Sequence, residues 1–415
     1  DLAVVNGEGV ISSGGSFADK NETMPYMYRA HPNMVEVLTN AGIDVVAVGN
    51  NHVGDYGREA FGEMLDRLST AGIAYSGGGH NLDDARRPAY RTVGDTVVAI
   101  VGGDLTMTET ARATTDSPGT LFFREAHLGK DEDRIVGELT KILKEARKHA
   151  HVVLFTPHWG RNYKTKPTRG LRSLAKRLIK AGYDAIMGHS AHWFHGVELI
   201  DGKPVMYDAG NLLLDYNGGD RGDESHRNIL WELTVSRAGV TGIKGHPLFL
   251  RKNHSTLAKG TVRDEILETL EKRSKRLGTD LAIENGVAVL ECDPGSISGP
   301  KGRPSPPVRP VPKEIRKAPN DAIIDEVPAG VNRVNIEYSE GIRLVGYKLL
   351  LDELTIPFSG QVVALYWTTD RKVNKSYHIH LEARGRHPGT EKPKKGYAGH
   401  LPGDWVLPTD EWPVG

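Results

Sequence analysis

Cysteine is almost absent from this sequence: Cys292 is the single cysteine among 415 residues. One thiol excludes an internal disulfide framework and a zinc site built from cysteine thiolates. A bound metal would therefore take nitrogen and oxygen ligands from His, Asn, Asp and Glu side chains. The compartment stays open, because a cytoplasmic protein and an exported protein without disulfides both fit this composition.

Net charge and long apolar runs are absent as well. Lys plus Arg and Asp plus Glu both number 53, so no overall field draws the chain to nucleic acid or to a membrane, and we expect no nucleic-acid partner. The sequence has no apolar run of the roughly 18 residues that a membrane helix needs. Its apolar content of 38% and charged content of 26% suit a folded globular protein.

The length and the distribution of proline divide the chain. At about 150 residues per domain, 415 residues predict two or three domains. Strand and helix patterns alternate over residues 1–298, as in an α/β domain. Residues 299–330 are dense in proline and predict an extended linker. Residues 331–415 have mostly strand signals and predict a small β-sandwich module, which we expect to be cut short at its end.

Local patterns predict the elements of these domains. Helices are expected at 31–40, Arg58–Ala71, Asp131–His149, Arg169–Ala181 and Thr261–Leu277. Hairpins are expected around Gly94-Asp95 and Asp201-Gly202, and the strands of the last module at Leu344–Leu351, Gln361–Thr368 and Tyr377–Ala383. The glycine cluster at 76–81 lacks the Gly-Lys-Ser/Thr ending of a phosphate-binding loop, so we interpret it as an ordinary loop.

Polar loops follow several predicted strands. Apolar runs at Asp1–Val5, Ile43–Val48, Val152–Phe155 and Tyr183–Met187 lead into loops rich in His, Asn and acidic residues. These loops are Asn6-Gly7-Glu8, Gly49–Gly57, His158-Trp159-Gly160 and Gly188-His189-Ser190-Ala191-His192, with Asp208-Ala209-Gly210-Asn211 after a later strand. Ligands bind at the carboxyl ends of strands in open α/β sheets, so we expect the loops to converge on one site.

The residue types in these loops suit metal chemistry. Neutral imidazole, amide and carboxylate groups are ligands for divalent ions, and the candidates are Glu8, Asn51, His158, His189 and His192. Two ions about 3.5 to 4 Å apart can activate water and hold both oxygens of a displacement. His52 would donate a proton to a leaving group, and Asp55 would orient His52.

Other residues are candidates for substrate contact. Arg29 and Arg161 could hold an anionic substrate, although an exposed arginine usually has no specific role. Trp159 could line the pocket or equally belong to the core, and Asn211 is a further candidate for substrate binding. A single histidine on a loop is usually a surface or packing residue, so His189 and His192 stand out by their spacing after a strand and a glycine.

Taken together, the motifs resemble those of the CapA family, the poly-gamma-glutamate capsule biosynthesis proteins related to calcineurin-like metallophosphoesterases. The resemblance is carried by Asn6-Gly7-Glu8, Asn50-Asn51-His52, His158-Trp159-Gly160, Gly188–His192 and Asp208–Asn211, in this order over residues 1 to about 250. It implies a four-layer α/β/β/α sandwich that binds one or two divalent ions, Mn, Fe or Zn. Asn51 would be a metal ligand and His52 the adjacent catalytic histidine.

The sequence departs from the pattern at three points. The Asp-x-His of the phosphoesterases is absent, so one metal position would lack ligands unless a segment with a further strand precedes Asp1. Gly-His-Ser-Ala-His is one residue longer than the usual Gly-His-x-His, which leaves the role of His192 open. Gly7 replaces a leucine that is usual in the CapA pattern.

The resemblance implies a role in making, attaching or releasing an anionic polymer at the cell surface, together with capsule-synthesis membrane proteins. We expect such a protein outside the cytoplasm or at the membrane, through a segment before Asp1. Two alternatives remain among enzymes, because a fold does not fix a reaction: a phosphoesterase for phosphorylated substrates, or a peptide amide hydrolase or epimerase. A third alternative is a non-catalytic protein that binds the polymer.

Overall fold

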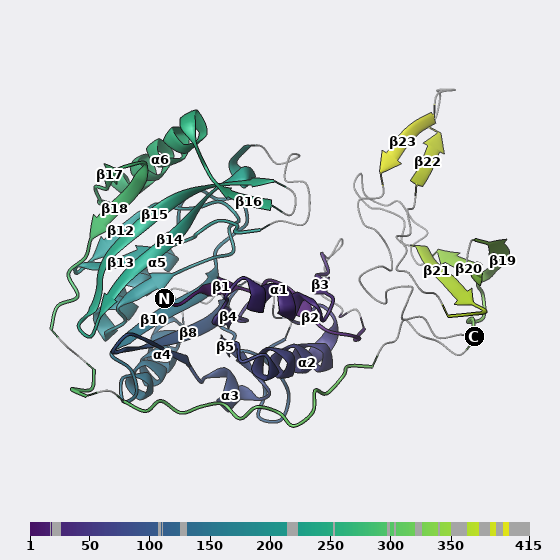
Figure 1. Ribbon diagram of the computed structural model, residues 1–415, viewed down its shortest axis with the longest axis horizontal. Coiled ribbons are helices and arrows are strands. Elements are labelled where there is room, and N and C mark those ends of the chain that lie inside the picture. Colours follow the sequence, from purple (N-terminus) through teal and green to yellow (C-terminus); the bar gives the residue numbers. More distant parts are fainter. Residues whose placement is uncertain are drawn as a thin grey trace.

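The protein is a mixed α/β protein in a computed structural model (Figure 1). The structure describes residues 1–16, 18, 26–106, 109, 111–124, 131–213, 223–251, 254–296, 299–302, 304–319, 326–338, 341–349, 363–372, 382–386 and 393–397. None of the helices in these residues combines the length and the apolar character that a membrane span requires.

Five of the six α-helices in the described residues lie where the sequence predicts them, and the short helix Leu82–Ala85 was not predicted; local signals explain the ends of the helices. In α5, Thr168 accepts a hydrogen bond from the Leu171 backbone N–H at the start, and Gly182 adopts a φ of 119° at the end. The helices are α1 (Met34–Asn40), α2 (Gly57–Thr70), α3 (Leu82–Ala85), α4 (Glu132–Ala146), α5 (Arg169–Ala181) and α6 (Gly260–Lys275), with a 3-10 helix η3 (Asp223–His226).

Three sheets of three or more strands lie within the described part of residues 1–291. A parallel sheet has the order β1-β4-β5, with β1 (Val4–Asn6), β4 (Val45–Ala47) and β5 (Ala74–Ser76). A second sheet has the order β12-β13-β11-β10-β8-β7, with β7 (Ala89–Val93), β8 (Thr96–Leu105), β10 (Val152–Trp159), β11 (Ala185–Met187), β12 (Val197–Ile200) and β13 (Lys203–Met206). Both predicted hairpins are confirmed as antiparallel pairs.

The third sheet is antiparallel and follows in sequence. Its order is β14-β15-β18-β17, and β16 also pairs with β15, with β14 (Arg227–Ser236), β15 (Gly239–Arg251), β16 (His254–Leu257), β17 (Ala282–Glu284) and β18 (Val287–Glu291). Two short pairs complete the fold: β2 (Val10–Ile11) with β3 (Arg29–Ala30), and β6 (Gly78–Gly79) with β9 (Gly119–Thr120).

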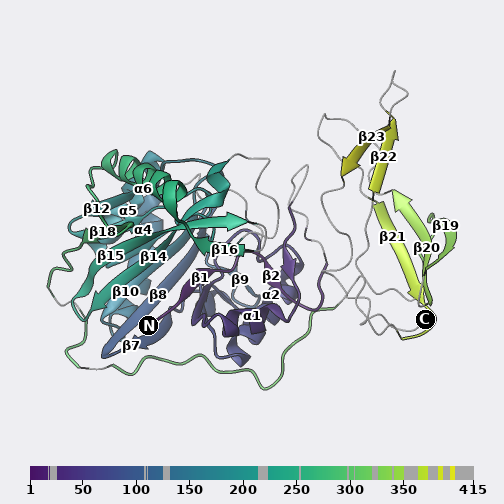
Figure 2. The same ribbon diagram turned by 45° about the horizontal axis from the view of Figure 1, so that its top comes forward.

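The six-stranded sheet is buried on both faces, which explains the unbroken apolar runs of its central strands. Val97 and Val101 of β8 point to the core beneath α4 and α5, whereas Val98 and Ile100 point to the core shared with β15. On the far side of the antiparallel sheet, α6 buries Ile266 and Leu270. Helix α2 covers the three-stranded sheet with Phe61 and Leu65. Figure 2 shows this stacking of helices and sheets from a second direction.

Strand β10 is longer than predicted, because we placed its end at Phe155 and its bounds are Val152–Trp159. Proline commonly ends a strand because it lacks an N–H donor. Here Pro157 stays in the strand, where it pairs with Gly103 of β8, and its carbonyl accepts a hydrogen bond from the His189 N–H. His158 and Trp159 are therefore strand residues, and the description of them as a loop is wrong.

The proline-rich segment lies on the α/β part of the chain. Figure 1 shows it as a green trace that passes beneath α3 and α2. Its Arg309 guanidinium donates hydrogen bonds to the carbonyls of Tyr75, Asp84 and Arg87. Further along, the Ala318 N–H donates to the buried Glu63 carboxylate at 2.7 Å. The described part of this segment has neither helix nor strand, as predicted, but it packs as an extended strap.

Beyond the strap, the regular elements in the described residues are strands. β19 (Asn332–Glu337), β20 (Ile342–Leu349) and β21 (Val363–Thr369) form one antiparallel sheet, and β22 (Glu382–Arg386) pairs with β23 (Pro393–Tyr397). The predicted strands at Leu344–Leu351 and Gln361–Thr368 are confirmed over their described residues. The predicted strand at Tyr377–Ala383 lies outside the described residues up to position 381. The division into domains and the β-sandwich stay predictions.

Candidate functional site

Asn50 holds the loops after β1 and β4 together. Its side chain is fully buried, and its Nδ2 donates to Asn6 Oδ1 at 3.2 Å and to the Gly7 carbonyl at 2.9 Å. Its Oδ1 accepts the His52 backbone N–H at 3.1 Å. Asn6 in turn donates to Glu8 Oε2 at 3.4 Å. One amide thus fixes the position of Glu8 relative to His52.

His52 is held by a carboxylate and an aromatic ring. Its Nδ1 lies 2.8 Å from Oδ2 of Asp55, which is fully buried, and the ring of Tyr28 covers the imidazole at 4.2 Å between centroids. The Tyr28 backbone N–H also donates to Asp55 Oδ2 at 2.6 Å. Because a carboxylate can only accept, the Nδ1 of His52 carries the proton and its Nε2 is directed elsewhere. That Nε2 lies 3.9 Å from Glu8 Oε1.

His158 and His189 form a buried pair at the ends of neighbouring strands. Their Nδ1 atoms are 2.7 Å apart, so one ring donates and the other accepts. Burial lowers the pKa of His158 well below its usual range, and electrostatic interaction with the neighbouring imidazoles of His189, His192 and His52 lowers it further. Burial lowers the pKa of His189 to about 3. Both imidazoles are therefore neutral at physiological pH, the form in which histidine binds metals.

The backbone around His189 leaves room for no side chain at position 188. A Cβ on Gly188 would lie 2.2 Å from the Tyr207 carbonyl oxygen and 2.3 Å from Trp159 Nε1, which are themselves hydrogen-bonded at 2.8 Å. The loop continues with positive φ angles at Ser190 (125°) and His192 (61°). Such strained residues commonly lie at functional sites.

His192, like His52, lies close to the Oε1 atom of Glu8. Its Nε2 lies 3.7 Å from Glu8 Oε1, and its Nδ1 contacts the side-chain oxygen of Asn211 at 2.9 Å. The Asn211 amide also donates to the His192 carbonyl, and the ring of Tyr163 stacks on the imidazole at 5.7 Å. Glu8 therefore lies between His52 and His192.

Asp208 is a buried carboxyl group beside this cluster. It accepts hydrogen bonds from the backbone N–H groups of Ala191 (2.6 Å) and Gly210 (2.8 Å). Burial raises its pKa well above the usual range, and the negative charge of Glu8 raises it further. Its backbone bonds fix the loop that carries His189 and His192.

The side chains at the site include the nitrogen and oxygen atoms that bind metals, although those that the structure describes do not converge closely on one point. Among the described residues, no group of three or more His, Cys, Asp or Glu side chains is placed to hold a metal ion. The Nε2 of His189, however, is buried and has no hydrogen-bond partner within the described structure. An orphaned nitrogen on a neutral imidazole fits a ligand role, so the residues present are compatible with a metal.

The residues expected to contact substrate differ in how exposed the structure leaves them. Arg29 is 7% exposed and stacks on the Tyr56 ring at 4.4 Å, so burial lowers its pKa. Trp159 is 1% exposed and packs in the core beneath α5, which removes it from a pocket wall. Arg161 is exposed, and Asn51 is half-buried beside His52.

Sequence reasoning missed Asn50, Tyr28, Tyr163 and Asp208 as parts of the site. Asn50 and Asp208 belong to the conspicuous loops Asn50-Asn51-His52 and Asp208–Asn211, so the motifs contained the signal. Tyr28 and Tyr163 reach their histidines from other segments, and no local pattern marks them.

Comparison with solved structures finds distant likeness to several proteins. A hypothetical protein from Thermus thermophilus aligns at 14% identity and a TM-score of 0.34, over 71% of this chain and 88% of that one. The NAD nucleotidase of Haemophilus influenzae aligns at 13% identity and a TM-score of 0.33, over 64% of this chain and 52% of that one.

Sequence comparison finds closer relatives. The chain is 31% identical over 286 residues to a protein of Mycobacterium tuberculosis named a probable polyglutamine synthesis accessory protein, covering 67% of this chain and 73% of that one. It is 28% identical over 198 residues to the capsule biosynthesis protein CapA of Bacillus anthracis, covering 48% of this chain and 46% of that one. Residues 1–216 match the model of the bacterial capsule synthesis protein family PGA_cap, and this chain belongs to that family.

Proposed function

We propose that this protein acts in the synthesis, attachment or release of an anionic capsule polymer such as poly-γ-glutamate, through a hydrolase-type site around Glu8, His52 and His192. Family membership and the names of the relatives in M. tuberculosis and B. anthracis support the pathway. The core of helices on both sides of two packed sheets supports the four-layer α/β/β/α arrangement as the finer description of the fold.

One observation carries the proposed chemistry: Glu8 lies between the Nε2 atoms of His52 and His192. The hydrogen bond from Nδ1 to Asp55 fixes the tautomer of His52 and leaves its Nε2 toward the site. In this position His52 can give a proton to a leaving oxygen or nitrogen, with Asp55 stabilising the charged imidazolium. Tyr28 covers one face of the imidazole and restricts its rotation.

A divalent metal would be held by Glu8, Asn51, His158, His189 and His192. Such an ion supplies an activated water molecule and neutralises charge on the reacting group. The neutral state of His158 and His189 and the orphaned Nε2 of His189 support this assignment. The hydrogen bonds of Asn211 to His192 orient that ring from behind.

A second candidate is a non-catalytic accessory protein that binds the polymer in the same place. It is favoured by the spacing of the described His and acidic side chains, which form no compact group of three or more around one point. The M. tuberculosis relative is also named an accessory protein.

Metal content and turnover separate the two candidates. The full chain would be purified from cells, analysed for Mn, Fe and Zn, and assayed with an aryl phosphate and with poly-γ-glutamate. Near-stoichiometric metal with turnover of either compound supports the enzyme. Polymer binding without metal and without turnover supports the accessory protein. The His158→Gln variant provides the control, because loss of a ligand should lower metal content about 10-fold or more without unfolding the protein.

A further inference from the structure

A stretch of the chain is strongly basic and lies next to His52, His158, His189 and His192, which we call the histidine cluster. From Gly160 to Gly182 the sequence contains no Asp or Glu, in a chain whose acidic and basic residues are equal in number. Its cations are Arg161, Lys164, Lys166, Arg169, Arg172, Lys176, Arg177 and Lys180. Eight of the 53 basic residues therefore lie together on the loop 160–168 and on α5, with no acidic residue among them in the sequence.

The loop 160–168 is fastened to the segment that carries His192. The Tyr163 N–H donates to the Ala191 carbonyl at 2.7 Å, and the Tyr163 ring stacks on His192. The Lys164 carbonyl contacts His195 Nε2 at 2.9 Å. One end of the basic stretch thus lies against the histidine cluster, with the side chains of Arg161, Lys164 and Lys166 exposed.

The other end of the stretch forms a stripe along α5, which we call the α5 stripe: Arg169, Arg172, Lys176 and Lys180. These residues recur at helical spacing and are exposed, while Leu171, Leu174, Ala175, Leu178 and Ile179 on the opposite face are buried. With a rise of 1.5 Å per residue, the stripe is roughly 16 Å long.

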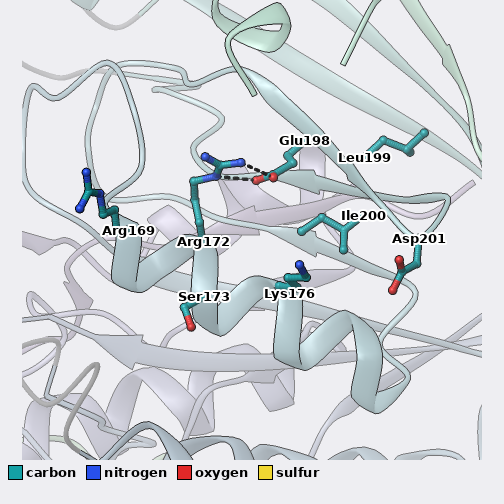
Figure 3. A pocket seen from close by; sticks show the side chains of 8 residues that line it. All are labelled: Arg169, Arg172, Ser173, Lys176, Glu198, Leu199, Ile200 and Asp201. Atoms are coloured by element: carbon teal, nitrogen blue, oxygen red, sulfur yellow. Dashed lines mark hydrogen bonds and ion pairs between the residues drawn. The ribbon is translucent and has the colours of Figure 1, made fainter. Parts of the chain in front are cut away.

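A groove of about 440 Å³ runs beside the α5 stripe. Its lining includes Arg169, Arg172 and Lys176 of α5 and Glu198 and Asp201 of the β12–β13 hairpin, and Figure 3 shows Arg172 reaching Glu198 while Arg169 points away from both carboxylates. The Glu198 carboxylate accepts two hydrogen bonds from Arg172, at 3.0 and 2.5 Å. That pairing fixes one guanidinium at the wall of the groove.

Most of the remaining cations of residues 160–182 form no ion pair with an acidic side chain in the described structure. Arg177 pairs with Glu132 and Asp133. In the described part of the chain, no ion pair is formed by Arg161, Lys164, Lys166, Arg169, Lys176 or Lys180.

The α5 stripe works against the stability of its own helix. Like charges four residues apart, as in Arg172 with Lys176 and Lys176 with Lys180, destabilise a helix. The first turn of α5 also contains no acidic residue to match the helix dipole. The α5 stripe therefore keeps a charge pattern that costs the helix some stability.

We propose that the loop 160–168 and the α5 stripe together form a binding track for a linear polycarboxylate, which leads one end of the polymer to the histidine cluster. The proposal rests on the proposed function, because it assigns the recognition surface for the same polymer. Spaced cations suit a flexible chain with one carboxylate per repeat. Single-stranded nucleic acid would require exposed aromatic rings for stacking, and the α5 stripe contains none.

The test is binding of a fluorescein-labelled poly-γ-glutamate of about 20 residues to the full chain, followed by fluorescence anisotropy at low and high salt. The variant combines Arg169→Glu, Lys176→Glu and Lys180→Glu. The matched control combines Lys301→Glu, Lys313→Glu and Lys317→Glu on the strap, where all three side chains are exposed and the change in net charge is the same. Within the described structure, no hydrogen bond or ion pair joins any of these six residues to the histidine cluster.

We expect the α5 variant to bind at least about tenfold more weakly than wild type, and the strap variant to stay within about twofold, with the difference shrinking at high salt. The proposed binding track would be refuted if both variants weakened binding equally, or if the α5 variant bound as well as wild type. It would also be refuted if the wild type did not bind the polymer, or bound a labelled oligonucleotide more tightly. Aryl phosphate turnover, measured in parallel, tests the site separately. If the protein turns over the aryl phosphate but does not bind the polymer through the loop 160–168 and the α5 stripe, only the binding track is refuted. If it binds the polymer there but turns over no substrate, only the catalytic function is refuted.

Discussion

Arg309 of the proline-rich strap offers a sharp test of whether this segment belongs to the first domain. Its side chain is 14% exposed and lies over the Tyr75 ring at 4.0 Å. It donates three hydrogen bonds to backbone carbonyls, at 2.9, 2.9 and 2.7 Å, and lies 3.3 Å from an Asp84 carboxylate oxygen. A linker that merely spans two domains would make none of these contacts.

The magnitude follows from the contacts that Arg309→Ala removes. A hydrogen bond to a charged group contributes about 1.5 to 3 kcal/mol, and a partly desolvated cation–π contact contributes about 1 to 2 kcal/mol. These contributions overlap, since one guanidinium makes all of them and its desolvation opposes them. We therefore expect a loss of about 2 to 4 kcal/mol in the free energy of unfolding of the first domain.

The assay is urea unfolding of the full chain followed by tryptophan fluorescence, supported by hydrogen exchange of β5. Arg309→Lys keeps the charge but not the forked geometry and should recover less than half of the loss. Lys313→Ala, on an exposed position of the same strap, is the matched control and should change stability by less than about 0.5 kcal/mol. An Arg309→Ala variant as stable as Lys313→Ala would refute the reasoning.

The remaining predictions concern packing and pH. Gly7→Ala places a Cβ 2.7 Å from Val46 Cγ1 and should lower the free energy of unfolding by about 1 to 3 kcal/mol. Gly137 lies within α4 with open space around it, so Gly137→Ala should raise the free energy of unfolding by up to about 1 kcal/mol. Thermal unfolding of the two variants compares these effects. Burial lowers the pKa of His195 to about 4, so the unfolded chain binds more protons between pH 6.5 and 4. Stability should fall by about 3 kcal/mol through this window as pH decreases, and His195→Gln, which can still donate to the Lys164 carbonyl, should flatten that part of the pH dependence.

The elements of the fold were predictable wherever the signal is local. Helix α5 matches its predicted bounds, because Thr168, Gly182 and the apolar stripe of the helix lie within one short segment. The end of β10 was not predictable, since Pro157 remains in the strand through pairing with segments distant in sequence. The strap shows the same limit: its composition predicts an extended chain, and only the folded partners around Arg309 determine where it packs.

The candidate site was predictable to a similar depth. Strand-end motifs correctly indicated that Glu8, His52 and His192 lie near one another, because parallel strands bring their carboxyl ends together. The spacing of His52 and Asp55 also indicated their hydrogen bond. Burial could not be read in advance, and it removes Trp159 from the list of substrate contacts. The roles of the site residues in metal binding and proton transfer stay predictions.

The central claim is that His52 transfers a proton at a metal-dependent site, and the His52→Gln variant tests it most directly. Turnover of an aryl phosphate or of poly-γ-glutamate would be measured for the full-length wild type and variant, together with metal content and thermal stability. We predict a fall in kcat of about 10²- to 10⁴-fold, with metal content and Tm close to those of wild type. Unchanged turnover in a folded, metal-loaded His52→Gln protein would contradict the account.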